Sequence, residues 1–351
     1  MSTRYPQRMT QRNIAALAGV SQATVSLVLN DRRDTTGRVP PETRERVMAI
    51  IRGTTYVADP AARRLAGAGN RILGVFTYEA AFPKESANFY TPLLRGIESE
   101  AEQLGCDLLL FTSPRVLNGQ RRVFHEDNRL GLADGCILLG QEMDNEDLAQ
   151  LVATQAPFVA IGRRAVPGVP FVGVDYATST QKLVRLALEV GHSRFFYLSV
   201  ESSAESFRDR RQGFAAGLTN SHVEHAKRFS SIRELPQAWE VIRAYHPTVL
   251  FLESETFLPQ ITELAAASGW SIPGDLSVVV LGDVSAAGTN PADFTRLSPP
   301  RTELGSAAVR LLDRVITGQD PELSQDLQTL LPCPVHAGTT LVVPPNERTH
   351  S

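Results

Sequence analysis

The segment from Asn13 to Asn30 reads NIAALAGVSQATVSLVLN and decides how the first part of the chain folds. Its first half carries four apolar residues at helical spacing, which are Ile14, Ala15, Leu17 and Ala18. Gly19 ends that helix because glycine tolerates the left-handed conformation that a tight turn requires. Ser21 then stands at the N-cap position of a second helix, Gln22 to Leu29. The pattern predicts two short helices joined by a glycine turn.

Two kinds of structure share this pattern, and the segment by itself leaves both open. One is an ordinary αα-hairpin, which is common in helical proteins. The other is a helix-turn-helix, whose second helix normally enters the major groove of DNA. In that geometry, the residues that face outward or lie near the edge of the second helix are Gln22, Ala23, Ser26 and Leu27.

The segment is one of three motifs, which are AGVSQATVSLVLN at Ala18–Asn30, PETRERV at Pro41–Val47 and AARRLAG at Ala61–Gly67. In combination they resemble the lac repressor/galactose repressor family of bacterial transcription regulators, and the resemblance continues over nearly the whole chain. It implies an N-terminal all-α helix-turn-helix domain with a hinge helix. It also implies a two-lobed α/β body of the periplasmic-binding-protein type with parallel sheets.

The distribution of charge favours a DNA-binding head on a separate body. The net charge of the 351 residues is −3. Residues 1–71 hold twelve arginines and five acidic residues, a formal charge of +7, whereas the remainder holds 23 basic and 33 acidic residues, a formal charge of −10. A basic head is typical of a DNA-binding domain, and a solvated basic face is the alternative.

Composition and length exclude several classes of protein. The hydrophobic fraction of 42% and the charged fraction of 21% are those of a globular protein, with length for two or three domains. Cys106, Cys136 and Cys333 are widely spaced and form no disulfide framework or metal motif, which fits a reducing cytosol. No apolar segment suits a signal peptide or a membrane span, so we expect a cytoplasmic protein without a membrane partner.

The head is predicted to consist of two parts. Residues 1–58 form the helix-turn-helix domain, in which Thr10 caps the first helix and Pro41 begins a third. Residues 59–71 form the hinge helix and linker. The resemblance implies that this helix orders when two protomers bind an operator, and that Leu65 wedges into the minor groove. A plain linker with one exposed leucine is the alternative.

Candidate DNA-binding residues occur in both parts of the head. They are Thr10, Ser21, Gln22, Ala23, Thr24, Ser26, Leu27, Asn30, Arg63, Arg64 and Leu65. Gln22 can bond an adenine edge. Leu27 departs from the family, which usually carries an arginine there that can read guanine. Leucine offers only apolar contact, for instance to a thymine methyl group, so the base preference at that position should differ.

Strand-like and helix-like segments alternate through the body, residues 72–343, which predicts parallel sheets covered on both faces. The predicted strands are Ile72–Thr77, Asp107–Phe111, Gly135–Leu139, Phe158–Ile161, Phe171–Val174, Phe195–Val200, Val249–Leu252 and Leu276–Leu281. The predicted helices include Thr91–Gly105, a stretch near Arg121–Leu130, Ala177–Glu189, Asp209–Leu218 and Leu258–Ala267. So many strands indicate two lobes, placed at residues 72–162 with 296–327 and at residues 163–295 with 328–343, before a tail at 344–351.

Ligands bind at the carboxyl ends of strands in such folds, and a cleft between two lobes is the default site. The candidate effector-binding residues are Tyr78, Glu79, Phe89, Tyr90, Arg163, Asp175, Arg210, Ser254 and Asp283. Arg210 is the strongest, because it matches the family's effector-binding arginine three residues before Gly213-Phe214, and an arginine fork suits sugar hydroxyls or a carboxylate. Each candidate can instead be an ordinary surface residue.

Two departures from the family concern this pocket. Ser254-Glu255 stands where the family often has Asn-Asp, and Gly282-Asp283 stands where it often has two acidic residues. The usual sugar-binding aspartate is therefore missing. We expect a sugar or sugar derivative that need not be a plain monosaccharide.

These features predict a sequence-specific DNA-binding transcriptional regulator, of the repressor type, controlled by a small-molecule effector between the lobes. A homodimer on a palindromic double-stranded operator is expected, because two-fold dimers match palindromic half-sites. Neither catalytic residues nor a cofactor or metal site is expected, because the motifs for them are missing. A sugar-binding protein of an uptake system and a Rossmann-type enzyme are the alternatives.

Overall fold

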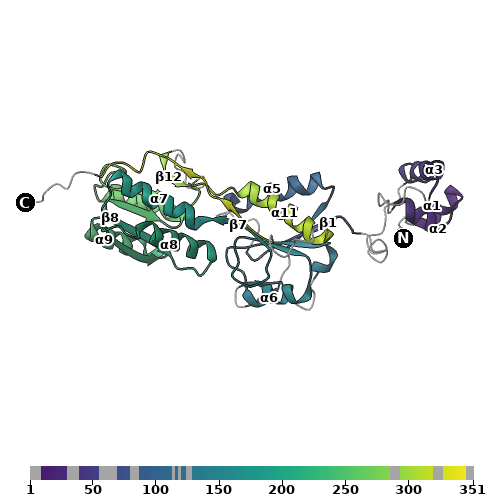
Figure 1. Cartoon of the computed structure of the whole chain (residues 1–351), viewed down its shortest axis with the longest axis horizontal. Coiled ribbons are helices and arrows are strands. Elements are labelled where there is room, and N and C mark those ends of the chain that lie inside the picture. The colour runs from purple at the N-terminus through teal and green to yellow at the C-terminus, as the bar shows by residue number, and fades with distance from the viewer. Residues whose placement is uncertain are drawn as a thin grey trace, which may run out of the picture. The chain divides into compact units, whose positions relative to one another are not determined.

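The structure is a computed structural model that describes residues 9–29, 39–54, 69–79, 87–112, 115–117, 120–123, 129–284, 293–318 and 327–344. Its contacts divide the chain into two units, Met1–Arg71 and Ile72–Ser351, and each is described by itself (Figure 1). Four candidate DNA-binding residues lie outside the described residues, namely Asn30, Arg63, Arg64 and Leu65. Residues 59–68 of the predicted hinge segment lie outside them as well.

The described residues of the first unit form three helices, α1 Gln11–Ala18, α2 Gln22–Leu29 and α3 Pro41–Arg52. Each helix contributes one fully buried aliphatic side chain to a small core, and these are Ile14, Val25 and Val47. The bounds of α2 are those that the sequence predicts. Leu17 differs from the expectation, because 60% of its surface is exposed although its spacing matches that of the buried residues of α1.

Local hydrogen bonds fix the start of α1 and the turn between α1 and α2. Thr10 Oγ1 accepts from the Asn13 amide at 3.3 Å, and Asn13 Oδ1 accepts from the Thr10 amide at 3.0 Å, which completes a capping box. Gly19 has φ 64°, and Ser21 Oγ accepts from the Thr24 amide at 3.1 Å. The predicted capping residues and the glycine turn are therefore confirmed.

The described part of the second unit forms two six-stranded sheets beside a short two-stranded one. All neighbouring strands of the first sheet, order β13-β7-β6-β5-β1-β2, are parallel. Its strands are β1 Ile72–Thr77, β2 Asp107–Phe111, β5 Gly135–Leu139, β6 Phe158–Ile161, β7 Phe171–Asp175 and β13 Gln328–Pro332. The second sheet, order β14-β12-β11-β10-β8-β9, is parallel except between β12 and β14. Its strands are β8 Arg194–Val200, β9 Glu224–Ser230, β10 Val249–Leu252, β11 Ser277–Val280, β12 Thr295–Leu297 and β14 Val335–His336.

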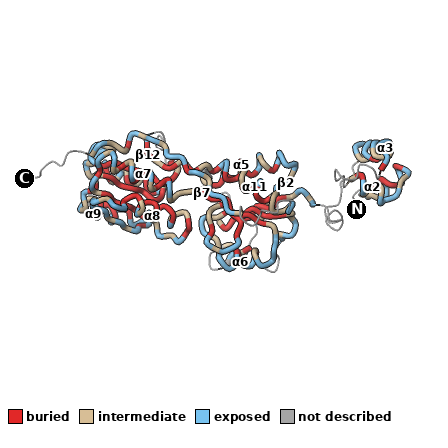
Figure 2. The backbone as a smooth tube through the Cα atoms, in the orientation of Figure 1, coloured by how far each residue is buried: buried red, intermediate tan, exposed pale blue. Residues whose placement is uncertain are grey.

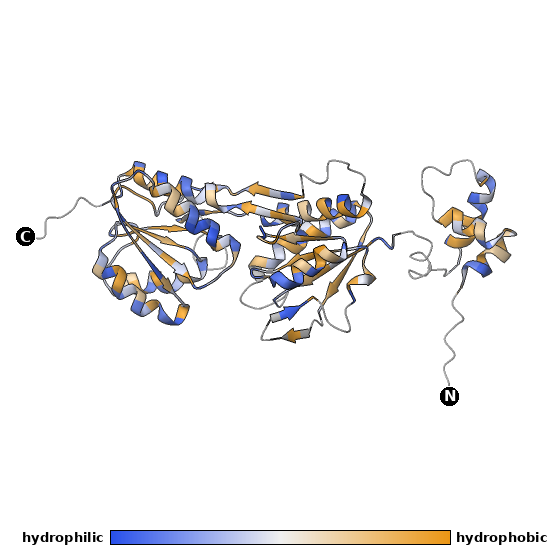
Figure 3. Cartoon of the chain, turned by 60° about the horizontal axis from the view of Figure 1, so that its bottom comes forward, coloured by the Kyte–Doolittle hydropathy of each residue, from blue (hydrophilic) through white to orange (hydrophobic). Residues whose placement is uncertain are grey.

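Each sheet packs with its own helices to form a lobe, as Figure 1 shows. The first lobe has α5 Ala87–Gln103, α6 Asn145–Thr154 and α11 Arg301–Thr317, and the second has α7 Tyr176–Val190, α8 Glu205–Leu218, α9 Leu235–Tyr245 and α10 Leu258–Ala267. Three short 3₁₀ helices are η1 Leu130–Leu132, η2 Ile232–Glu234 and η3 Glu255–Phe257. Buried residues follow the strands and the inner sides of the helices (Figure 2), and most strands are hydrophobic (Figure 3). The expected two-lobed α/β architecture is confirmed.

The chain passes between the lobes at three places, between β7 and α7, between β12 and α11, and between β13 and β14. The lobe boundaries therefore differ from the expected ones. β7 and β13 pair with each other in the first sheet, although both fall in residues expected in the second lobe. β12 lies in the second sheet, although residues 296–327 were expected in the first lobe. Apolar strand segments resemble one another, whereas the sheet that a strand joins depends on partners distant in sequence.

A second difference concerns the stretch near Arg121–Leu130, which was expected to be helical. Its start belongs to a hairpin, in which β4 Gln120–Arg122 pairs antiparallel with β3 Arg115–Leu117. Arg122 forms ion pairs with Asp144 at 2.6 Å and Asp147 at 3.2 Å. These tertiary contacts hold the segment extended, and a local sequence pattern does not reveal them.

Helices α5 and α11 approach each other closely in the first lobe. A methyl group added at Gly305 of α11 would overlap the carbonyl oxygen of Leu93, and one added at Gly96 of α5 would overlap that of Thr302. The missing side chains let the two backbones touch. This contact ties the start of α11 to the lobe that contains β1.

Candidate functional site

The face of α2 that turns away from the core carries three of the candidate DNA-binding residues. Gln22, Ala23 and Leu27 are exposed, whereas Thr24 and Ser26 are half-buried and Val25 and Val28 point into the core. Thr10 and Ser21 are also exposed, next to the starts of α1 and α2. The exposed face of α2 thus carries both polar and apolar side chains.

A cavity of about 280 Å³ lies between the lobes of the second unit. Five of the candidate effector-binding residues line it, and these are Phe89, Arg163, Arg210, Ser254 and Asp283. Phe89 and Arg163 belong to the first lobe, and the other three belong to the second. A molecule in this cavity would therefore contact both lobes at once.

The other four candidates do not line this cavity. Glu79 binds the hydroxyl of Tyr90 with one carboxylate oxygen and accepts from the Gln141 amide at 3.1 Å with the other. Tyr90 is buried, and Tyr78 lines with Glu79 a neighbouring hollow between the lobes. Asp175 caps α7 by accepting from the Thr178 amide at 3.0 Å. Sequence position relative to a strand end predicts the region of these side chains but not their partners.

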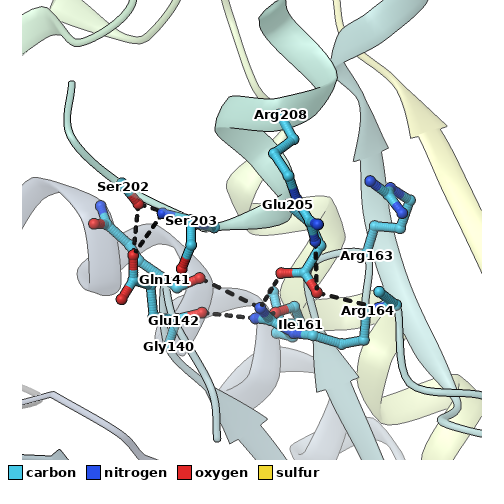
Figure 4. A network of polar contacts seen from close by, with 12 residues as sticks. Gly140, Gln141, Glu142, Ile161, Arg163, Arg164, Ser202, Ser203, Glu205 and Arg208 are labelled. Carbon is cyan, nitrogen blue, oxygen red and sulfur yellow. Dashed lines mark hydrogen bonds and ion pairs between the residues drawn. The ribbon is translucent and has the colours of Figure 1, made fainter. Parts of the chain in front are cut away.

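Two consecutive arginines after β6 connect the lobes through carboxylates of α8. Arg163 Nε donates to Asp209 Oδ2 at 2.8 Å, and this bonding raises the pKa of Arg163. Arg164 lies 3.3 Å from Glu205 and donates to the carbonyl oxygens of Gly140 and Ile161 (Figure 4). Burial lowers the pKa of the Arg164 guanidinium, whereas the nearby Glu205 carboxylate raises it.

A further contact between the lobes lies beside this network. Glu142 Oε1 of the first lobe accepts from the Ser202 hydroxyl at 2.6 Å and from the Ser203 amide at 3.2 Å (Figure 4). These bonds, with the two arginine pairs, connect the lobes in the arrangement that the structure shows. Because all of them are polar contacts across a cleft, the arrangement can exchange with a more open one.

Arg301, at the start of α11, lines the cavity although it is not among the candidates that the sequence predicts. Its Nη1 donates to Asp283 Oδ2 at 3.1 Å, and its guanidinium carbon lies 5.1 Å from the centre of the Phe89 ring. The ion pair joins the first lobe to the loop after β11. Asp283 is thus a partner of Arg301 in this structure.

Arg210 lies on aromatic rings in place of an acidic partner. Its guanidinium carbon is 3.8 Å from the centre of the Tyr176 ring and 5.2 Å from that of Phe207. Only 6% of Arg210 is exposed. Burial raises the pKa of Tyr176, and the nearby Arg210 acts in the opposite direction.

The candidate list thus omits several cavity residues, among them Arg164, Tyr176, Phe207, Glu255 and Arg301. Three of them adjoin predicted candidates, so extending each candidate by one residue would have found Arg164, Tyr176 and Glu255. Phe207 precedes Arg210 by one helical turn, which is also a visible signal. Arg301 carries no local signal, because its place at the cavity depends on the crossing from β12 to α11.

The described residues hold no group of three or more His, Cys, Asp or Glu side chains that could bind a metal ion. Burial raises the pKa of Cys136 to about 12 and that of Cys333 to about 11, so both thiols stay protonated at neutral pH. None of the helices in the described ranges combines the length and hydropathy needed to cross a bilayer.

Two family models match the chain in separate regions. Residues 10–59 match the model of bacterial regulatory proteins of the lacI family, and residues 184–340 match a periplasmic binding protein-like domain. The first region contains all three helices of the first unit, and the second extends from α7 to the segment after β14.

Full-length relatives agree with both matches. Catabolite control protein A of Staphylococcus xylosus is 23% identical over 319 residues, 89% of this chain and 94% of the relative. The HTH-type transcriptional regulator CelR of Thermobifida fusca is 27% identical over 334 residues, 90% of this chain and 94% of the relative.

Solved structures share the fold. The lac repressor dimer bound to operator and the anti-inducer ONPF has a TM-score of 0.74 at 22% identity, covering 96% of this chain and 100% of that one. A complex of the regulator CelR with cellobiose has a TM-score of 0.63 at 23% identity, covering 95% and 100%. The chain therefore combines a helix-turn-helix domain of the lacI family with a periplasmic-binding-protein-like domain.

Proposed function

We propose that this protein is a sequence-specific DNA-binding transcriptional regulator, of the repressor type, whose operator affinity is set by a small molecule between the lobes. The observation that carries the proposal is the inter-lobe cavity, which side chains of both lobes line. A ligand there binds the closed and open arrangements with different affinity, and such a difference is what shifts a two-state equilibrium. The helix-turn-helix supplies the DNA-binding output.

On the DNA side, the exposed face of α2 supports base reading by Gln22, Ala23 and Leu27. A glutamine can bond the edge of adenine, and a leucine can contact the thymine methyl group. The remaining DNA contacts stay predictions, and they concern Thr10, Ser21, Thr24, Ser26, Asn30, Arg63, Arg64 and Leu65. Arg63, Arg64 and Leu65 would act in the hinge segment, residues 59–71.

On the ligand side, we propose a sugar or sugar derivative bound by Phe89, Arg163, Arg210, Ser254 and Asp283. The size of the cavity and its mixture of aromatic and charged side chains support a small polar molecule. The cellobiose bound to the relative CelR supports the same chemical class.

We further propose a homodimer on a palindromic operator. One head of three short helices reads few bases, and a two-fold dimer doubles the contacts at fixed spacing. The operator-bound lac repressor, a structure of the same fold, is a dimer, which supports this assembly. Because bacterial operators lie in the cytoplasm, the proposal places the protein there.

The experiment is an electrophoretic shift of the full chain on palindromic DNA selected from a randomised library. The titration is repeated with sugars, sugar acids and sugar phosphates. The proposal predicts a saturable shift whose midpoint moves with at least one of these compounds. Absence of any saturable, sequence-specific shift, with and without the compounds, would contradict it.

A further inference from the structure

Three of the four arginines that line the cavity have acidic partners within the protein. Arg163 pairs with Asp209, Arg164 with Glu205, and Arg301 with Asp283. Their charges are therefore compensated before any ligand binds, and their ion pairs connect the lobes and the loop after β11.

Arg210 is the exception. Among the described residues, no carboxylate oxygen lies within 4.0 Å of its guanidinium nitrogens, and its Nε has no hydrogen-bond partner. The next residue, Arg211, shows the contrast, because its Nε donates to Glu253 at 2.8 Å. Arg210 is thus a cation that is 94% buried, lines the cavity and lacks an anion.

Burying a charged group without a partner is unfavourable, because the group loses its hydration and gains no equivalent interaction. The rings of Tyr176 and Phe207 cover the guanidinium, but they accept none of its N–H groups in the plane. The in-plane donors of Arg210 therefore remain for a ligand. A carboxylate or a phosphate matches this planar fork best.

Glu255 is the opposite case in the same cavity. Its carboxylate forms no ion pair or hydrogen bond with the described residues, and it occupies the space beside Gly282. A methyl group added at Gly282 would overlap Glu255 Oε2. The sequence after β11 has Gly282 at a position where the family often has an acidic residue. Glu255, which follows the neighbouring strand β10, places a carboxylate beside this glycine.

We propose that the ligand of this cavity is an acid that carries hydroxyl groups, with its carboxylate or phosphate on Arg210 and its hydroxyls on Glu255. This inference rests on the proposed effector function and names the ligand class. The two uncompensated side chains have opposite charge and do not neutralise each other, so one ligand must present an anion and donors at separate positions. Sugar acids and sugar phosphates have this arrangement.

The first test uses sulfate as an oxyanion probe on the full chain. Thermal unfolding is followed while sulfate replaces chloride at constant ionic strength, for the wild type, Arg210→Met and Arg185→Met. Arg185 is an exposed arginine of α7 outside the cavity, so its variant controls for the lost charge. We expect a saturable rise of Tm in the wild type and the Arg185 variant, and its loss in Arg210→Met. Equal rises in all three proteins would overturn the proposal, as would a wild-type response no larger than that of Arg210→Met.

The second test uses two matched series in calorimetric titrations: galactose, galacturonate and galactose 6-phosphate, and the glucose equivalents. Each acid should bind the wild type about a hundredfold more tightly than its parent hexose does. Arg210→Met should remove this difference in affinity. The acid that binds more tightly shows whether the site prefers a carboxylate or a phosphate. A hexose that binds as tightly as its acids would overturn the proposal, and if no member binds, the sulfate titration decides.

Failure of this inference differs visibly from failure of the proposed function. A protein that shifts a selected operator and responds to neutral sugars would retain its proposed function and refute the anionic ligand. A protein that binds acids at Arg210 but shifts no operator would support the anionic ligand and refute the proposed regulatory function.

Discussion

Arg163 and Asp209 join the two lobes through a two-point ion pair. Arg163 follows β6 of the first lobe, and both its Nε and its Nη2 donate to the carboxylate of Asp209 on α8 of the second lobe. The Arg163 side chain is 31% exposed and that of Asp209 only 8% exposed, so water screens the pair in part. The pair lies in the wall of the cavity between the lobes.

Replacing Asp209 with asparagine should weaken the closed arrangement. The Arg163 guanidinium then faces a neutral amide, and we expect a loss of about 1–2 kcal/mol, between the values for exposed and buried pairs. Small-angle scattering of the full chain should show a larger radius of gyration. Glu240→Gln removes an exposed ion pair within α9 and serves as the control. An unchanged radius in Asp209→Asn would show that this pair does not hold the lobes.

Replacing Gly305 with alanine should destabilise the first lobe. The added methyl group would overlap the carbonyl oxygen of Leu93 in α5, and a helix backbone cannot move aside without separating the two helices. Overpacking of this kind costs about 1–3 kcal/mol. Urea denaturation measures the loss. Gly131→Ala is the control, since nothing lies within 4 Å of a methyl group there, and equal stability of both variants would refute the close contact.

Replacing Leu27 with arginine should change the preferred operator. Leu27 is 37% exposed on α2, so the head keeps its core, while an arginine can bond guanine O6 and N7. Each such contact favours guanine over the other bases by about 1–3 kcal/mol. Selection from randomised palindromes should then enrich guanine at one position of each half-site. Leu17→Arg adds the same charge on α1 and should keep the wild-type consensus; if Leu27→Arg keeps it too, residue 27 does not read bases.

His192 makes the stability of the body depend on pH. Its side chain is 2% exposed, and burial lowers its pKa from the ordinary value of 6.5 to about 4. Between these values the unfolded chain binds a proton that the folded chain does not, so stability falls as the pH drops from 6.5 to 4. The loss is on the order of 3 kcal/mol.

The test compares denaturation midpoints of the wild type and His192→Gln across this range. The variant should lose most of the pH dependence between 6.5 and 4, whereas His222→Gln, at an exposed histidine, should retain it. Parallel curves for His192→Gln and the wild type would assign the acid sensitivity to other groups.

The sequence predicts well what depends on neighbouring residues. The bounds of α2, the cap at Ser21 and the turn at Gly19 follow from side-chain chemistry within a few positions. Most strands are also predicted within a residue or two, because their apolar runs end at polar residues. The same rule places Arg163 at the cavity, whereas Arg210, inside α8, is predicted from the family resemblance.

Features that depend on distant partners escape this reasoning. β7 and β13 join the first sheet through pairing over more than a hundred residues, which no local pattern records. Glu79 is directed toward Tyr90 by a hydrogen bond, and Asp175 caps α7. The placement of Glu255 beside Gly282 appears only when two adjacent strands are seen together.

The most direct test of the account is the affinity of the full chain for a selected palindrome relative to random DNA of the same length, measured by fluorescence anisotropy at one fixed salt concentration. Specific regulators prefer their sites by about a thousandfold or more. The account predicts a ratio of that size, which falls when Gln22 is replaced by alanine. A ratio near one, with salt-dependent binding to any DNA, would contradict sequence-specific regulation.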